Sequence, residues 1–283
     1  MSIPKGIHPG LGMDEYHAWK LDKAKLIDGP ISCSTLKRFY PNPYKWLREP
    51  EPNQSEAMRI GSLFDLAVTD REGLKAVAVH DFDSFRTKEA REWKAANAHK
   101  LICTEAELAQ AEKAAVRINE HKIAGPIFDA AQFQVGIIGE VGEIPAKCLL
   151  DVLPNEESEW AETLVDYKTT SKGLDDESIR KAIGDYCYHW QAAFYRALFN
   201  KVSEHRVCED FALVFQDVST LEIRVVKLSQ DAIGLGSRMV GKALEEFAKC
   251  AHRGIRSRYA NNCATLDLLP YHAMNEEEKL AEL

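Results

Sequence analysis

The feature that most limits how this chain can fold is a largely apolar run, residues 162–169, that carries opposite charges on Asp166 and Lys168. The run predicts a β-strand, and because side chains alternate across a strand, Asp166 and Lys168 share one face while Tyr167 points to the other. A carboxylate in an apolar strand needs a partner or an ion. Asp151 ends an earlier apolar run, and two carboxylates with an ammonium would hold Mg²⁺ and a water beside a phosphodiester. In the alternative interpretation, Asp166 and Lys168 form an exposed cross-strand charge pair and Asp151 starts a turn.

The length and composition are those of an ordinary globular protein. The chain has 283 residues, of which 45% are hydrophobic and 28% charged, enough to bury a full core. No apolar run approaches the roughly 20 residues that cross a bilayer, and the N-terminus lacks the apolar stretch of a signal peptide, so we expect a cytoplasmic protein with no membrane contact. The net charge of −8 argues against a protein that coats nucleic acid, but it does not exclude a local DNA-binding site.

The seven cysteines are scattered, odd in number and without the C-x-x-C spacing of zinc or redox motifs. Cys250 and Cys263 are too few and too far apart for an iron–sulfur cluster near the C-terminus. Without an export signal, we expect reduced thiols.

Three segments are expected along the chain. Residues 1–30 are rich in Gly and Pro and predict an irregular N-terminal arm. Residues 31–260 predict a single domain, with a helical part over 31–131 and a catalytic core over 132–252. Residues 261–283 predict a polar, loosely packed C-terminal tail.

Hydrophobic periodicity within these segments predicts a mixed α/β core with an N-terminal helical elaboration. The expected helices start near residues 34, 55, 87, 175, 189 and 229, and the third runs to about 122 with a capping box at residues 104–107. The expected strands are residues 134–141, 144–152, 162–169, 210–216 and 222–228, the first two and last two forming hairpins.

Four aromatic residues follow the first of these helices at short spacing: Phe39, Tyr40, Tyr44 and Trp46. They could stack on DNA bases, but aromatic residues at helical spacing are more often core, and that is the expectation.

A second polar pair completes the set of candidate site residues. Gln191 and Tyr195 lie one helical turn apart and share a helix face. With Asp151 and the Asp166-x-Lys168 strand, this ordered set resembles the PD-(D/E)xK nuclease superfamily, and more closely the exodeoxyribonuclease VIII group of phages and prophages. The resemblance spans most of the chain, through residues 31–34, 57–64, 165–170 and 188–195.

The resemblance implies a restriction-endonuclease-like core, a mixed central sheet flanked by helices, and a role for each motif residue. Asp151 and Asp166 would ligate Mg²⁺, with Mn²⁺ as a substitute, and the backbone carbonyl of Tyr167 would complete the ligand set. Lys168 would position and help deprotonate the attacking water and offset charge on the phosphate. The glutamine and tyrosine of the helix would brace the site or contact the DNA backbone.

The chain departs from the family pattern at two positions. The family usually shows Gly-x-x-x-His on the second helix, with the histidine as a metal ligand, whereas this chain has Gly61 and Asp65. Carboxylate oxygen suits Mg²⁺, so we expect Asp65 to be a ligand; it could instead be a solvated helix residue or mark reduced activity. Leu150 stands before Asp151 where the superfamily name has a proline, which is often absent.

The activity implied by the resemblance is a Mg²⁺-dependent DNA exonuclease that degrades linear duplex DNA from the 5′ end. It would leave 3′ single-stranded tails for a strand-annealing recombination protein, form a homo-oligomeric ring around DNA, and be encoded by a phage or prophage in a bacterial cytoplasm. Two alternatives stay open: a nuclease of the same superfamily with different polarity, of CRISPR-adaptation or helicase-associated type, and a catalytically weak module that binds DNA ends.

Overall fold

The computed structural model describes residues 4–11, 13–26, 29–51 and 53–281, so parts of the expected arm and tail lie outside the described residues. Within them, seven strands form one mixed sheet, ordered β1-β5-β6-β7-β8-β9 with β2 beside β6. These strands are β1 (Gly6–His8), β2 (Ile31–Ser32), β5 (Gln132–Val141), β6 (Ile144–Leu153), β7 (Thr163–Thr170), β8 (Asp210–Asp217) and β9 (Ile223–Lys227).

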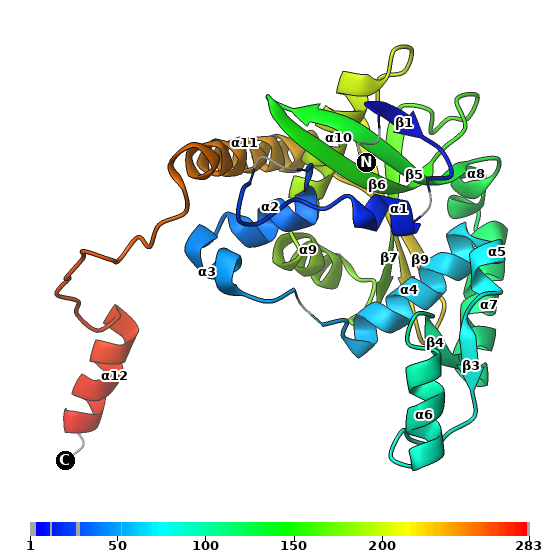
Figure 1. The fold of residues 1–283 in the computed structure, drawn as a ribbon, viewed down its shortest axis with the longest axis horizontal. Helices are drawn as coiled ribbons and strands as arrows, with labels where there is room; N and C mark the ends of the chain where they lie inside the picture. The colour runs from blue at the N-terminus through cyan, green and yellow to red at the C-terminus, as the bar shows by residue number, and fades with distance from the viewer. Residues whose placement is uncertain (1–3, 12, 27–28, 52, 282–283) are drawn as a thin grey trace.

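Helices cover both faces of this sheet and enclose two hydrophobic cores (Figure 1). The first core lies under α2 (Cys33–Phe39), α10 (Tyr188–Val202) and α11 (Gln230–Arg253). The second lies under α4 (Glu56–Thr69), α7 (Glu105–Glu120) and α8 (Ala124–Phe128). Leu164 belongs to the first core and its neighbour Val165 to the second, so β7 has the alternation predicted for it.

The two predicted hairpins and the predicted helix starts are confirmed. β5 and β6 pair antiparallel around Gly142, whose φ of +65° suits glycine, and β8 pairs antiparallel with β9. Asp175 caps α9 (Asp176–Asp185), accepting from the backbone of Ser178. The long closing helix is α11.

Two expectations about the N-terminal half were wrong. The arm expected to be irregular contains α1 (Met13–Ala18) and β1, which adds an edge strand through Ile7↔Ile137. Three residues are too few to show an alternating pattern, so the sequence carried no signal for this strand.

The continuous helix expected over residues 87–122 is divided. It contains α6 (Lys88–Ala96), β4 (Ile102–Thr104) and α7, and β4 pairs in parallel with β3 (Ala78–His80), after the short α5 (Arg71–Leu74). Cys103 in β4 is fully buried, so tertiary packing overrides the helical composition of its surroundings. Figure 1 shows that β3, β4 and α6 form a lobe that projects from the body.

The remaining features concern the aromatic run and the tail. Phe39 and Trp46, the latter in α3 (Pro43–Arg48), are buried in the first core with their ring centroids 5.3 Å apart, as the core interpretation predicts.

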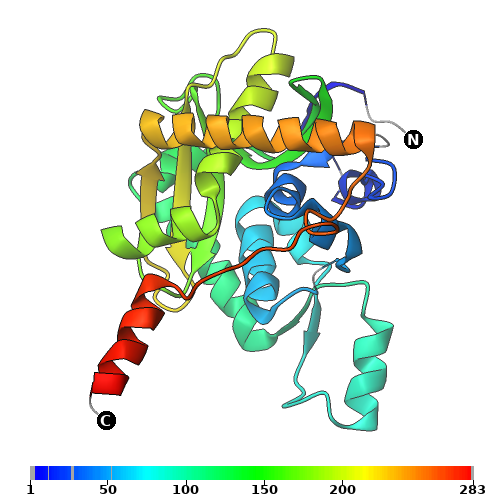
Figure 2. The same cartoon turned by 90° about the vertical axis from the view of Figure 1, so that its left-hand side faces the viewer.

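In the tail, α12 (Pro270–Ala281) has no buried residues and stands away from the body in both views (Figures 1 and 2). Across the described ranges, no helix combines the length and apolar character that spanning a membrane requires. The division of residues 31–260 into a helical part and a catalytic core stays a prediction.

Candidate active site

The candidate site lies where β6 parts from β7. The two strands share one bridge, Val152↔Val165, and the earlier residues of β6 pair instead with β2, through Ile31↔Ala146. Asp151 immediately precedes this last bridge to β7. Its side chain therefore enters the opening between diverging strands rather than a continuous sheet surface.

The β5 side of Asp151 is also irregular. Bridges at Phe133↔Val152 and Val135↔Leu150 place Gln134 opposite Asp151, but these two residues form no bridge themselves. Gln134 has a φ of +49°, in the left-handed region that non-glycine residues rarely adopt. Strained backbone of this kind persists where the surrounding contacts require it.

Asp151 fills the gap in the ladder with its own side chain. The backbone N–H of Tyr167 donates to Asp151 Oδ2 at 3.1 Å, so the carboxylate takes the place of a strand partner. Burial raises the pKa of Asp151 well above its usual value, and the nearby carboxylates Asp166 and Asp65 raise it further. The interpretation of Asp151 as a simple turn residue does not account for these contacts.

Asp166 is the most enclosed member of the site, at 1% exposure. Gln191 Nε2 on α10 donates to its Oδ1 at 2.7 Å, and Lys168 Nζ forms an ion pair with its Oδ2. The predicted shared face of Asp166 and Lys168 is confirmed. Gln191 contacts Asp166, and its role in bracing the site or contacting DNA stays a prediction. An exposed cross-strand charge pair is excluded by this burial.

Lys168 is held between carboxylates and an aromatic ring. Its Nζ lies 5.2 Å from the ring centroid of Tyr188, a cation–π arrangement. Burial alone would lower the pKa of Lys168, but Asp166 and Asp151 outweigh it and raise that pKa above its usual value. The group is therefore a charged donor at neutral pH.

Asp65 reaches the same place from α4. Gln134 Nε2 donates to its Oδ2 at 3.0 Å, and the Thr69 hydroxyl donates to its Oδ1 at 3.5 Å. Burial, with a smaller contribution from Asp166, raises the pKa of Asp65 to about 6, although Lys168 opposes this. Asp65 is thus a hydrogen-bonded member of the carboxylate group rather than a solvated helix residue.

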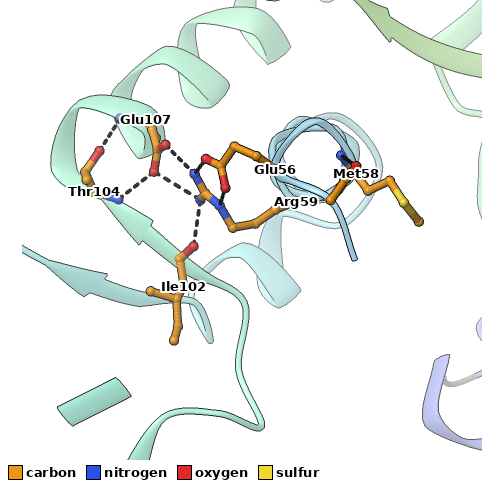
Figure 3. A network of polar contacts seen from close by, with 7 residues as sticks. Glu56, Met58, Arg59, Ile102, Thr104 and Glu107 are labelled. Carbon is orange, nitrogen blue, oxygen red and sulfur yellow. Dashed lines mark hydrogen bonds and ion pairs between the residues drawn. The ribbon is translucent and has the colours of Figure 1, made fainter. Parts of the chain in front are cut away.

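The helix that carries Asp65 is fixed to its neighbour by Arg59 (Figure 3). Arg59 Nη1 donates to Glu107 Oε2 at 3.1 Å and to the carbonyl of Ile102 at 2.7 Å, and Arg59 Nε donates to Glu56 at 3.0 Å. Glu107 and Thr104 also form the predicted capping box of α7. This network joins the start of α4 to the start of α7, which limits how far Asp65 can shift.

The two tyrosines of the motifs occupy different surroundings. Tyr167 points to the second core, where its hydroxyl donates to Gln216 Oε1 at 2.5 Å, so only its backbone faces the site and the ligand role of its carbonyl stays a prediction. Tyr195 packs at the edge of the first core, its ring centroid 6.3 Å from that of Phe211. Burial raises the pKa of Tyr195 well above its usual value, so its hydroxyl stays protonated.

The oxygen donors of the site are of the kind that binds a divalent cation. Asp65, Asp151 and Asp166 present hard oxygen donors, and the raised pKa values of Asp65 and Asp151 show that Lys168 does not compensate their charge. The chemistry fits Mg²⁺ or Mn²⁺. In the part of the chain that the structure describes, however, no three Asp, Glu, His or Cys side chains stand in a closed metal-ligating cluster. Lys168 engages Asp166, and Gln134 engages Asp65.

Sequence reasoning missed two contributors. Gln134 gave no signal, because a glutamine at the start of a strand looks like an ordinary surface residue until its positive φ and its contact with Asp65 are seen. Tyr188 falls within the helix motif, but only its position over Lys168 gives it a part in the site.

Comparison with known proteins supports the fold. A crystal structure named "Putative exonuclease", from Eubacterium rectale, matches with a TM-score of 0.57 and 17% identity, over 93% of this chain and 97% of that chain. A second structure, SSO0001, has a TM-score of 0.29 and 15% identity over 75% of this chain and 85% of that one, which is too distant to bear on the argument. No curated protein matches the sequence.

One family model covers most of the chain, from residue 32 to residue 268, and describes a PDDEXK-like domain of unknown function (DUF3799). The matched range contains every candidate site residue, and the mixed sheet flanked by helices is the fold expected from the sequence. The chain therefore belongs to this family of PDDEXK-like domains.

Proposed function

We propose that this protein is a metal-dependent exonuclease that acts on linear duplex DNA. The observation that carries the proposal is that Asp65, Asp151 and Asp166, from a helix and two strands, interact electrostatically around Lys168 in one buried site, where Asp166 forms an ion pair with the lysine. Burial and the neighbouring Asp166 raise the pKa of both Asp151 and Asp65, and buried carboxylates of this kind are costly and typical of sites that function with a cation. The name of the Eubacterium rectale protein supports exonuclease rather than endonuclease activity.

The site residues would have different roles in phosphodiester hydrolysis. Asp65, Asp151, Asp166 and the carbonyl of Tyr167 would hold Mg²⁺ or Mn²⁺, which when bound would polarise the phosphate and lower the pKa of an attacking water. Lys168 would position and help deprotonate the attacking water and would offset the negative charge that develops on the phosphate, and the nearby Asp166 and Asp151 favour its charged form. Its partner carboxylate is held in place by the amide of the α10 glutamine.

The 5′-to-3′ direction, the 3′ single-stranded product, the annealing partner and the ring are further parts of this proposal. They rest on the resemblance to the exodeoxyribonuclease VIII group. A phage or prophage origin and a cytoplasmic location rest on the same resemblance.

The test uses linear duplexes labelled separately at the 5′ and 3′ ends, together with closed circular DNA. With Mg²⁺ we expect early release of the 5′ label, intact circles, and no cleavage in EDTA. Lys168→Met should lower the cleavage rate roughly 10²- to 10³-fold, the usual effect of removing one preorganised electrostatic contact. Lys113→Met on the exposed face of α7 is the matched control and should cleave normally. Cleavage of closed circles, or full activity of Lys168→Met, would refute the assignment.

A second candidate function is a catalytically weak module that binds DNA ends. It is favoured by Asp65 standing in place of the family histidine, and by the engagement of Asp166 and Asp65 with protein donors in the described residues. Linear duplex that is bound but left uncut with either Mg²⁺ or Mn²⁺ would select this function.

A further inference from the structure

Two tyrosine rings are stacked beside the catalytic lysine, at the junction of α9 and α10. The ring centroids of Tyr186 and Tyr188 are 5.6 Å apart with an interplanar angle of 30°. Tyr188 lies under Lys168, whereas Tyr186 is on the outer side and is 50% exposed. A half-exposed aromatic ring leaves surface on which a planar partner can stack.

The backbone conformation at this junction positions the two stacked tyrosine rings. Tyr186 ends α9, its N–H donating to the carbonyl of Ala182, and Cys187 then adopts a φ of +51° before α10 begins. A cysteine in the left-handed region is strained. The change of chain direction at Cys187 brings the side chains of Tyr186 and Tyr188 to the same side. Cys187 and Tyr188 pack against the first core, whereas Tyr186 is left exposed beside them.

Lysines surround the pair of rings. Lys37 Nζ donates to the carbonyl of Tyr186 at 2.9 Å, and Lys172 Nζ donates to its hydroxyl at 3.3 Å while lying 5.5 Å from its ring centroid. Among the described residues neither lysine forms an ion pair with a carboxylate. Their charges are therefore available to the phosphates that flank a stacked base.

A cavity of about 280 Å³ adjoins the rings. Its lining includes Tyr186, Tyr188 and Lys172, together with Thr169 and Thr170, which directly follow Lys168 on β7. The volume lies just below the roughly 300–1,000 Å³ of pockets for drug-sized ligands, so it has room for a nucleobase.

We infer that Tyr186 is the stacking platform for a single unpaired nucleobase next to the scissile phosphate, with Lys37 and Lys172 binding its phosphates. The inference rests on the proposed function and specifies its substrate: a DNA end whose terminal nucleotide has left the duplex. Base–aromatic stacking tolerates any sequence, which suits a nuclease that must digest all of them.

The test is a binding measurement that needs no cleavage. The probe is a single-stranded oligonucleotide with 2-aminopurine as its 5′-terminal base, titrated with the full chain in Ca²⁺ in place of Mg²⁺. Stacking on a tyrosine quenches 2-aminopurine fluorescence. We expect quenching by the native protein and by Tyr186→Phe, which keeps the ring. Tyr186→Ala should lose the quenching and bind the probe about 10-fold more weakly.

One control variant and one cleavage assay separate a local effect from a loss of structure. Tyr259→Ala removes a tyrosine that is 69% exposed in the loop after α11, and it should behave as the native protein does. With Mg²⁺, the native protein should cleave an end with a normal unpaired nucleotide about 10-fold faster, as kcat/KM, than one with an abasic terminal nucleotide, and Tyr186→Ala should show no preference.

Each outcome decides the inference. Equal quenching by Tyr186→Ala and the native protein, or no quenching by the native protein, would overturn it. Quenching without any cleavage by the native protein would leave the platform in place and reject the proposed nuclease function. Normal cleavage with no effect of Tyr186→Ala on the abasic preference would reject the platform alone.

Discussion

Asp65 makes a quantitative prediction about stability, because its pKa is raised from 3.8 to about 6. Between these two pH values the folded chain holds a proton on Asp65 that the unfolded chain has released, so the free energy of unfolding falls as pH rises through this window. Below pH 4 both states are protonated and there is no penalty. Above pH 6 the full penalty is present, and the shift of about two pH units corresponds to at most about 3 kcal/mol.

Asp65→Asn removes this charge and keeps an oxygen that can accept from Gln134. In EDTA at pH 7, the variant should therefore be more stable than the native protein by up to about 3 kcal/mol, and the difference should vanish near pH 4. Urea unfolding at several pH values measures it. Asp129→Asn, at an exposed position, is the control and should change stability by less than about 0.5 kcal/mol at every pH.

Mg²⁺ should act in the opposite direction, because a cation bound to the carboxylates stabilises the folded native chain by mass action and has one ligand fewer in Asp65→Asn. The stabilisation by Mg²⁺ should thus be larger in the native protein than in the variant. If Asp65→Asn in EDTA is no more stable at pH 7 than the native protein, or keeps the same pH slope, the buried-carboxylate reasoning is wrong.

Three further substitutions test the supports of the site. Arg59→Met should lower the free energy of unfolding by about 2 kcal/mol, because the charge-assisted bonds to Glu107 are lost. A loss below about 0.5 kcal/mol, measured by urea unfolding, would show that the network does not stabilise the fold. Thr104→Ala should cost about 1 kcal/mol as a lost helix cap, and unchanged thermal unfolding would contradict this. Gln191→Leu leaves Asp166 Oδ1 without its donor and should cost about 1–3 kcal/mol and lower the cleavage rate; full activity with normal stability would exclude a bracing role.

The sheet and the first part of the site could be predicted because they depend on short-range rules. Strand alternation alone places Asp166 and Lys168 on one face, and the helical repeat places Gln191 where it can reach that face. The division of the 87–122 segment by β4 could not be predicted, because its three residues form a strand only through parallel pairing with β3. Pairing between segments distant in sequence leaves no local pattern.

The surroundings of Asp65 could not be predicted either, because they too depend on contacts between segments distant in sequence. These surroundings explain how an aspartate can stand where the family usually has a histidine. Gln134 lies opposite Asp151 in the sheet and donates its amide to Asp65 on α4, so a single residue with a left-handed backbone connects the two carboxylates. An aspartate whose pKa is raised by burial needs a donor, and the strained backbone of Gln134 places that donor where it is needed. Asp65 and Gln134 are therefore best regarded as one unit: the Gln134 amide donates to Asp65 Oδ2, and the left-handed backbone of Gln134 sets the position of that amide.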